Sequence, residues 1–147
     1  MRAALRRPFF RQGEDGMTGN DIFNTALALL GEPSSSQSDY DSEVVIRLLN
    51  TALVLAYRYN QQLREYRGRE KMAEIPAISS LADGIDYEEE FVRNVLPYRL
   101  ASDLAFADEE TQKAEYYNQM FQTTMLDFTT PIAGPVADVY GGAADEV

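Results

Sequence analysis

The sequence predicts an all-α fold: a small bundle of about four helices with extended N- and C-terminal arms. Four segments between residues 20 and 126 place apolar residues at the three- and four-residue spacings of a helix. Most of the intervening segments are rich in Ser, Asp, Gly and Pro, which are typical of turns. The length of 147 residues and hydrophobic content of 45% suit one globular domain with its own core.

The first helix is expected to begin near Asn20 or Asp21 and to end before Gly31. Asn20 can cap its N-terminus, and Gly31 followed by Pro33 stops the helix. The next ten residues, EPSSSQSDYD at 32–41, predict a polar loop.

The second helix is expected to be long, from Ser42 to Tyr66. Leu53, Val54 and Tyr57 widen its apolar face. Such breadth indicates a helix covered on more than one side, which is either the central helix of the bundle or one shared with another subunit. The main apolar positions step by three and four: Val45, Leu48, Leu49, Ala52, Leu55, Ala56, Tyr59, Leu63 and Tyr66.

A connector at 68–90 leads to the third helix. The Ile-Pro step at 75–76 forces an extended conformation, and the Asp-Gly pair at 83–84 marks a turn. The third helix is expected from Asp86, with the glutamates at 88–90 in its first turn, where the helix dipole favours anions.

Pro97 lies inside this third helical segment, where a proline removes a backbone hydrogen bond at a cost of about 3 kcal/mol. It predicts either a kink in one continuous helix or the first position of a new segment after residues 94–96. In both cases the proline ring adds to an apolar surface.

Asp108 is expected to cap a fourth helix that ends near Leu126. The residues that follow include two prolines and three glycines and predict no regular element. The chain therefore divides into an N-terminal arm (1–19), a helical domain (20–126) and a C-terminal arm (127–147).

The net charge of −11 is unevenly distributed, with five cations in residues 58–71 and nine carboxylates in residues 83–110. So acidic a chain should not bind nucleic acid strongly, because phosphate contacts need cations. The charged segments are either solvated faces or pair between neighbouring copies. The pairing hypothesis assigns the subunit interface to Arg58, Arg64, Arg67, Arg69, Lys71, Glu88, Glu89, Glu90, Asp108 and Glu109.

Tyrosine and arginine occur together at the end of the second helix, in YRYNQQLREYRGR at 57–69. Both residue types are enriched at subunit interfaces. Half-buried helix positions with solvated hydroxyls explain the tyrosines equally well, so both interpretations stay open.

The sequence predicts no catalytic residue, no metal site and no cofactor. It contains neither cysteine nor histidine, which excludes thiol nucleophiles, thiolate zinc sites and the commonest general base. The acidic segments at 39–43 and 83–90 lack calcium-loop spacing, and no glycine-rich phosphate loop occurs. The longest apolar runs are too short to span a bilayer, and residues 1–12 lack the apolar core of an export signal. We therefore expect a protein that is no enzyme and has no membrane partner.

The order and spacing of features across residues 20–126 resemble the head–tail connector (adaptor) proteins of tailed bacteriophages. None of these features is specific alone, and the resemblance lies in their combination. Upstream of the connector they are NDIFNTALALLG at 20–31 and LLNTAL at 48–53. From the connector onward they are Ile75-Pro76, SLADGIDY at 80–87, LPYRLA at 96–101, DEE at 108–110 and YYN at 116–118.

The resemblance implies a structural virion protein that forms a ring, usually twelve-fold, beneath the portal protein. Such a ring lies in the neck between capsid and tail, extends the DNA channel and presents a surface to stopper or tail proteins. DNA would pass through without specific binding, and host cytoplasm would be the location during assembly. Extended termini in this family often hold the portal or neighbouring subunits, which implies a docking arm with Ile132, Val136, Val139 and Tyr140.

Two other classes of function stay open. A stopper or terminator, which is also a neck or tail protein, would favour a β-rich fold. An acidic DNA-mimic regulatory protein would be a monomer or dimer with carboxylates spaced like phosphates. The basic segment at 1–16 has no counterpart in the family pattern, and it either reaches an acidic partner or precedes a true first residue at Met17.

Overall fold

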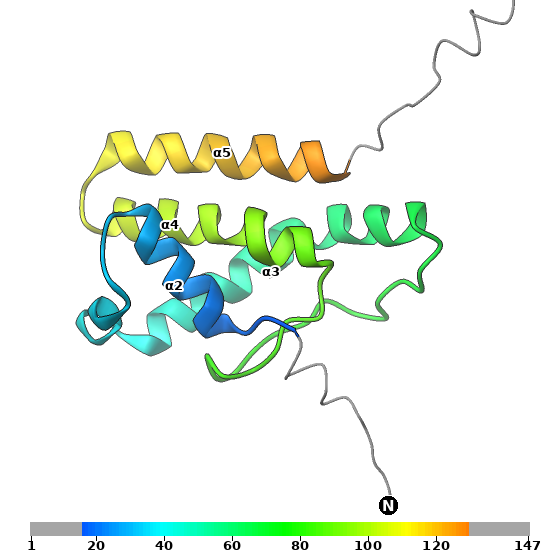
Figure 1. The fold of residues 1–147 in the computed structure, drawn as a ribbon, viewed down its shortest axis with the longest axis horizontal. Coiled ribbons are helices and arrows are strands. Elements are labelled where there is room, and N and C mark those ends of the chain that lie inside the picture. The colour runs from blue at the N-terminus through cyan, green and yellow to red at the C-terminus, as the bar shows by residue number, and fades with distance from the viewer. Residues whose placement is uncertain (1–15, 130–147) are drawn as a thin grey trace, which may run out of the picture.

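The computed structural model describes residues 16–129, and all regular elements in this range are helical (Figure 1). The predicted all-α class is confirmed for this part of the chain. The docking-arm residues Ile132, Val136, Val139 and Tyr140 lie outside it. The elements are α2 (Gly19–Leu29), the 3-10 helix η1 (Ser34–Asp39), α3 (Ser42–Tyr66), the π-helical turn η2 (Phe91–Val95), α4 (Leu96–Ala107) and α5 (Thr111–Thr129).

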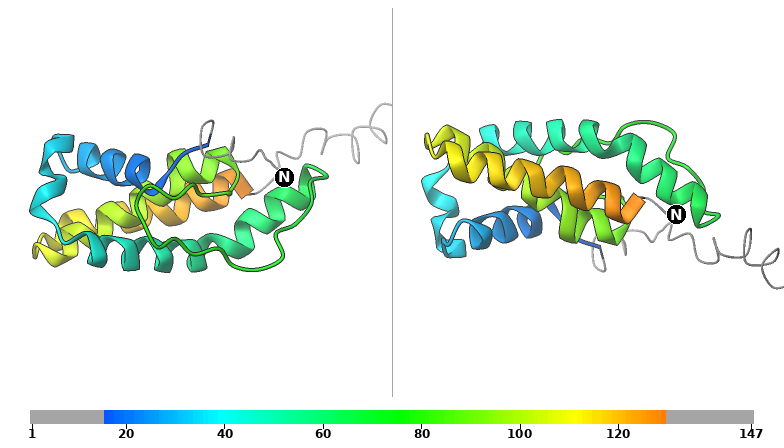
Figure 2. Two further views of the ribbon diagram at one scale, coloured as in Figure 1. Left: turned by 90° about the horizontal axis from the view of Figure 1, so that it is seen from below. Right: turned by 90° about the horizontal axis from the view of Figure 1, so that it is seen from above.

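The central helix of the bundle is α4, which packs against α2, α3 and α5 (Figures 1 and 2). One of the two interpretations of the second predicted helix, α3, was that it is the central helix of the bundle. In the structure the central helix is α4. Helix α5 runs back along α4 after a short turn. The largest fully buried side chains come from α2, α3, η2 and α4: Phe23 and Leu27 on α2, Leu49 and Leu53 on α3, Phe91 on η2, and Leu96 and Leu100 on α4.

Helix α2 begins at Gly19 because Thr18, and not Asn20, is its N-cap. The Thr18 hydroxyl accepts a hydrogen bond from the Asp21 N–H at 3.4 Å, and the Asp21 carboxylate accepts one from the Thr18 N–H at 2.9 Å. This reciprocal arrangement is a capping box. The carbonyl of Met17 also accepts a hydrogen bond from the Ile85 N–H at 3.0 Å. Residues 17–19, which the sequence placed in the N-terminal arm, thus belong to the folded unit.

The segment predicted as a polar loop at 32–41 contains the 3-10 helix η1. Two side chains hold it against α2. Gln37 donates a hydrogen bond to Asn24 Oδ1 at 2.6 Å, and the Tyr40 ring packs edge-on against Phe23 with centroids 5.8 Å apart. The bounds of the next helix, α3, agree with the prediction, and Asp41 caps it by accepting the Glu43 N–H at 2.9 Å.

The third helical segment begins at Glu89, three residues later than predicted. It then passes through the π turn η2, in which the Leu96 N–H donates to the Phe91 carbonyl five residues earlier. Pro97 is the second residue of α4 and is buried. Both interpretations of Pro97 are therefore partly right: the helical path is continuous, and a new α-helix starts at Leu96, one residue before the proline. A π turn is wider than an α turn, which gives the proline ring room beside the preceding carbonyls.

The turn between α4 and α5 differs from the prediction, because Asp108 ends α4 and does not cap α5. Glu109 adopts a left-handed φ of 63°. Its N–H donates to the Phe106 carbonyl at 3.0 Å, and the Glu110 N–H donates to the Ala105 carbonyl at 2.9 Å. These two bonds form a Schellman motif, which usually has glycine in the left-handed position. Helix α5 ends at Thr129, three residues beyond the predicted end.

Candidate functional site

The most organised polar site lies where α3 meets the irregular connector that follows it, residues 67–88. Two amide side chains of α3 each bind one connector residue through both amide atoms. Asn50 donates to the Ile78 carbonyl at 3.0 Å and accepts the Ile78 N–H at 2.8 Å. Gln61 does the same with the carbonyl and N–H of Met72, at 3.0 and 2.9 Å. These side chains satisfy the connector backbone as a neighbouring β-strand would.

Two buried groups fix the end of the connector on α3. The Asn60 side chain is fully buried, and its Oδ1 accepts the Glu88 N–H at 2.8 Å. The Tyr87 hydroxyl donates to the Leu53 carbonyl at 2.5 Å. Burial raises the pKa of Tyr87 well above its ordinary value, so this hydroxyl keeps its proton and remains a donor at neutral pH. These two hydrogen bonds therefore hold the residues just before the third helical segment against α3.

A buried carboxylate with three arginines lies beside these groups. We call Glu88, Arg64, Arg67 and Arg69 the Glu88 cluster. Only 2% of the Glu88 side chain is exposed. One carboxylate oxygen lies 2.9 Å from Arg67 Nη1 and 3.5 Å from Arg69 Nη1, and the other lies 3.5 Å from Arg64 Nε. Such an arrangement compensates the cost of burying the carboxylate.

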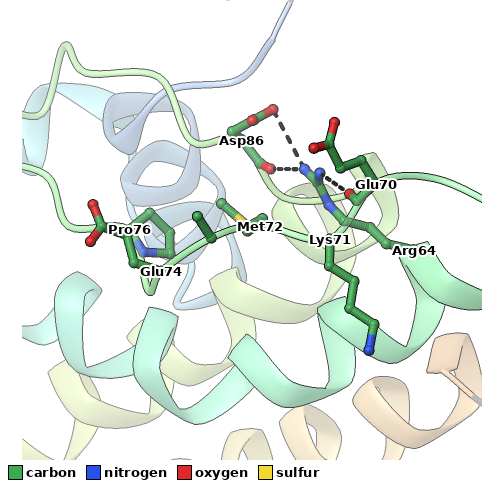
Figure 3. A pocket seen from close by; sticks show the side chains of 8 residues that line it. Arg64, Glu70, Lys71, Met72, Glu74, Pro76 and Asp86 are labelled. Carbon is green, nitrogen blue, oxygen red and sulfur yellow. Dashed lines mark hydrogen bonds and ion pairs between the residues drawn. The ribbon is translucent and has the colours of Figure 1, made fainter.

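Arg64 joins the two ends of the connector (Figure 3). Its Nη1 donates to the Glu70 carbonyl at 3.1 Å, and its Nη2 donates to the Asp86 carbonyl. Its buried Nε has no hydrogen bond and only the ion-pair contact with Glu88. Arg67 completes the site through hydrogen bonds to Glu90.

In the single chain, several of the predicted interface residues have partners within the same chain. Arg64, Arg67 and Arg69 meet Glu88 and Glu90 of the same chain, because the connector folds back onto α3. The pairing of basic and acidic segments predicted between neighbouring copies is thus largely satisfied within one.

The other predicted interface residues remain on the surface. Lys71 pairs with Glu65 at 3.4 Å, Glu89 pairs with Arg93, and Arg58 contacts the Tyr59 ring. Asp108 and Glu109 lie in the α4–α5 turn, at the opposite end of the bundle from the C-terminus of α3 (Figure 1). The structure does not bring them near the arginines.

An open groove of about 390 Å³ borders the Glu88 cluster. Its charges are mixed, with two cations and three carboxylates, so they do not converge on a ligand of one sign. Within residues 16–129, no group of three or more carboxylates is arranged to hold a metal ion. The groove is lined by Arg64, Glu70, Lys71, Met72, Ala73, Glu74, Pro76 and Asp86 (Figure 3).

We predict that the Glu90–Arg67 pair makes stability depend on acid pH. The hydrogen bond from Arg67 holds the pKa of Glu90 below its ordinary 4.5, against the opposing effect of burial. Because the folded-state pKa is depressed, this stabilisation is present above the unfolded pKa and is lost as pH falls through the folded one. Thermal melts from neutral pH to about pH 3 should show a shallower acid decline for Glu90→Gln than for the natural protein. Parallel curves would contradict a role for this pair.

Helix α3 also has a second apolar face that nothing in residues 16–129 covers. On this face Val44 and Leu55 expose 49% and 42% of their surface, and Val54, about 100° further round the helix, exposes 54%. The breadth of apolar positions predicted either a central helix or a helix shared with another subunit. Since α4 is central, the second face of α3 is left to solvent in the single chain.

No sequence pattern predicted the connector contacts of Asn50, Asn60 and Gln61, because such side chains on a helix are mostly exposed. Among the described helices, none has the length and apolarity to cross a membrane. In comparisons with known proteins, no family model, no curated protein and no solved structure matches this chain.

Proposed function

We propose that this protein is a non-enzymatic structural component of a tailed-phage virion, a head-to-tail connector (adaptor). In this role it assembles into a ring, usually twelve-fold, that docks under the portal protein, extends the DNA channel and offers the attachment surface for stopper or tail proteins. The neck of the virion is its place, after assembly in the host cytoplasm. The observation that carries the proposal, together with the resemblance across residues 20–126, is the uncovered apolar face of α3.

The uncovered face favours assembly with other copies. The exposed Val44 and Leu55, with the partly buried Leu48 between them, follow one another at the spacing by which helices pack together between subunits. Contiguous exposed apolar surface on a water-soluble helix marks an interaction site. A helix that is apolar on two sides and covered on one side is therefore what an assembling subunit needs.

The charge of the chain suits a channel through which DNA moves. Phosphate contacts need cations, and a net charge of −11 gives few that are free to make them. An acidic lining repels the DNA backbone and so favours sliding over binding.

Two other functions receive less support. A stopper or terminator would favour a β-rich fold, whereas every regular element of residues 16–129 is helical. A DNA mimic needs free carboxylates spaced like phosphates along one face. Here Glu88 and Glu90 are instead bound to arginines.

Electron microscopy of the purified protein, alone and mixed with portal rings from the phage that encodes it, tests this function. We expect ring-shaped particles, and portal rings that carry an added layer on one side. A monomer that leaves the portal unchanged would refute the proposal. Inhibition of a DNA-binding protein by such a monomer would favour the DNA-mimic alternative.

A further inference from the structure

We infer that the contact between neighbouring subunits joins the outer face of α3 in one copy to the outer face of α5 in the next. This rests on the self-assembly proposed above and specifies which surfaces make it. We define the α3 stripe as Val44, Leu48, Thr51 and Leu55, and the α5 stripe as Tyr116, Gln119, Thr123 and Leu126.

The α5 stripe lies on a helix face that carries no charge. From Tyr116 to Leu126 the sequence YYNQMFQTTML contains no Asp, Glu, Lys or Arg, in a chain of which 25% is charged. Tyr116 and Leu126 expose 56% and 51% of their surface, and Gln119 and Thr123 are also exposed. The core of a protein interface is depleted of charge and enriched in aromatic residues, whereas solvated helix faces are normally charged.

The two stripes match in spacing and length. Residues 44, 48, 51 and 55 are separated by four, three and four positions, and residues 116, 119, 123 and 126 by three, four and three. This alternation keeps side chains on one face and lets them interdigitate with a facing helix. At 1.5 Å per residue each stripe extends about 15–17 Å.

The charges that flank the two stripes are opposite in sign. Arg47 and Arg58 flank the α3 stripe, eleven residues apart, and Glu115 and Asp127 flank the α5 stripe, twelve residues apart. Neither of these carboxylates has an ion-pair partner among residues 16–129, and Arg58 contacts its neighbour Tyr59, whereas Arg47 pairs with the exposed Glu43 at 3.6 Å.

This complementarity decides which partner the α3 stripe accepts. Two copies of so acidic a chain repel each other over most of their surface. Contact of α3 with α5 brings cations toward carboxylates, whereas contact of α3 with α3 brings arginines together. Because two different faces meet, the same contact repeats from copy to copy and closes a ring, whereas a symmetric contact would stop at a dimer.

Disulfide cross-linking tests the inference, because the natural chain has no cysteine. Thr51 and Gln119 are exposed and lie near the middle of their stripes, where they face each other when the helices pack antiparallel. In parallel packing Thr51 faces the exposed Thr123 instead, so Thr51→Cys/Thr123→Cys is tested in the same way as Thr51→Cys/Gln119→Cys, and the inference requires a ladder from one of the two double variants. Under mild oxidation, the double variant whose cysteines face each other should form a ladder of covalent dimers, trimers and higher oligomers. On a denaturing gel each single variant should show no covalent oligomer, and an equal mixture of the two single variants of that pair should give covalent dimers only.

A matched control replaces Thr51 by the exposed Ala28 of α2, as Ala28→Cys/Gln119→Cys, and should give no ladder. Abundant dimer from Thr51→Cys alone would overturn the inference in favour of a symmetric α3 contact. No ladder from either double variant, when both still form rings in the electron microscope, would overturn the choice of faces and leave the proposed function intact. A double variant without ladder or rings, in a protein whose natural form also ignores the portal, would overturn both.

Discussion

Replacing Glu88 by glutamine should lower the free energy of unfolding by about 3–5 kcal/mol, the cost of removing one partner from a buried ion pair. The substitution keeps the shape of the side chain and removes its charge. Three arginines then lose their shared carboxylate, and Arg64, which is only 8% exposed, keeps only the 3.6 Å contact between its Nη2 and the exposed carboxylate of Asp86. Chemical denaturation at neutral pH, followed by circular dichroism, measures the loss.

The neighbouring residue provides the control, because Glu89→Gln is the same chemical change at the surface. The Glu89 side chain is 68% exposed and pairs with an exposed Arg93 four residues later. Such surface pairs contribute about 0–1 kcal/mol. Equal losses for the two variants would contradict a central role of the Glu88 cluster.

Replacing Asn60 by alanine should cost about 2 kcal/mol, because the buried Glu88 N–H then has no acceptor. The connector should also exchange its amide hydrogens faster, since Asn60 holds its last turn against α3. Denaturation and hydrogen exchange read out the two effects separately.

Gln62→Ala provides the comparison for Asn60, since Gln62 is exposed on the same helix and should cost less than about 0.5 kcal/mol. Combining Asn60→Ala with Glu88→Gln should cost less than the sum of the single variants, because both act at the same residue. Additive losses would show that the amide and the carboxylate act independently.

The helices that the sequence predicted best are those whose ends carry local signals. The bounds of α3 agree because Asp41 caps it and its apolar spacing continues to Tyr66. The end of α4 was missed because Glu109 takes a left-handed conformation that glycine usually takes, so the acidic DEE step looked like the start of the next helix. The start of the third helical segment was missed because Glu88 is held by Asn60, far away in the sequence.

The candidate site was predictable only in its charges. The opposite charges of residues 58–71 and 83–110 are apparent in the sequence, and in the structure arginines of the first segment pair with glutamates of the second. Whether it acts within or between chains depends on the path of the connector. That path is set by hydrogen bonds from the side chains of Asn50 and Gln61 to the backbone of the connector. No local sequence pattern predicts these bonds. The second apolar face of α3 was predictable, because apolar residues on two sides of one helix appear directly in its spacing.

The mass of portal rings before and after incubation with an excess of this protein tests the central claim most directly. If the protein is a connector, the mass should rise in one step by about twelve chains of 16.5 kDa and then stay constant as more protein is added. A portal mass that does not change, at concentrations where the protein itself remains a monomer, would contradict a connector function.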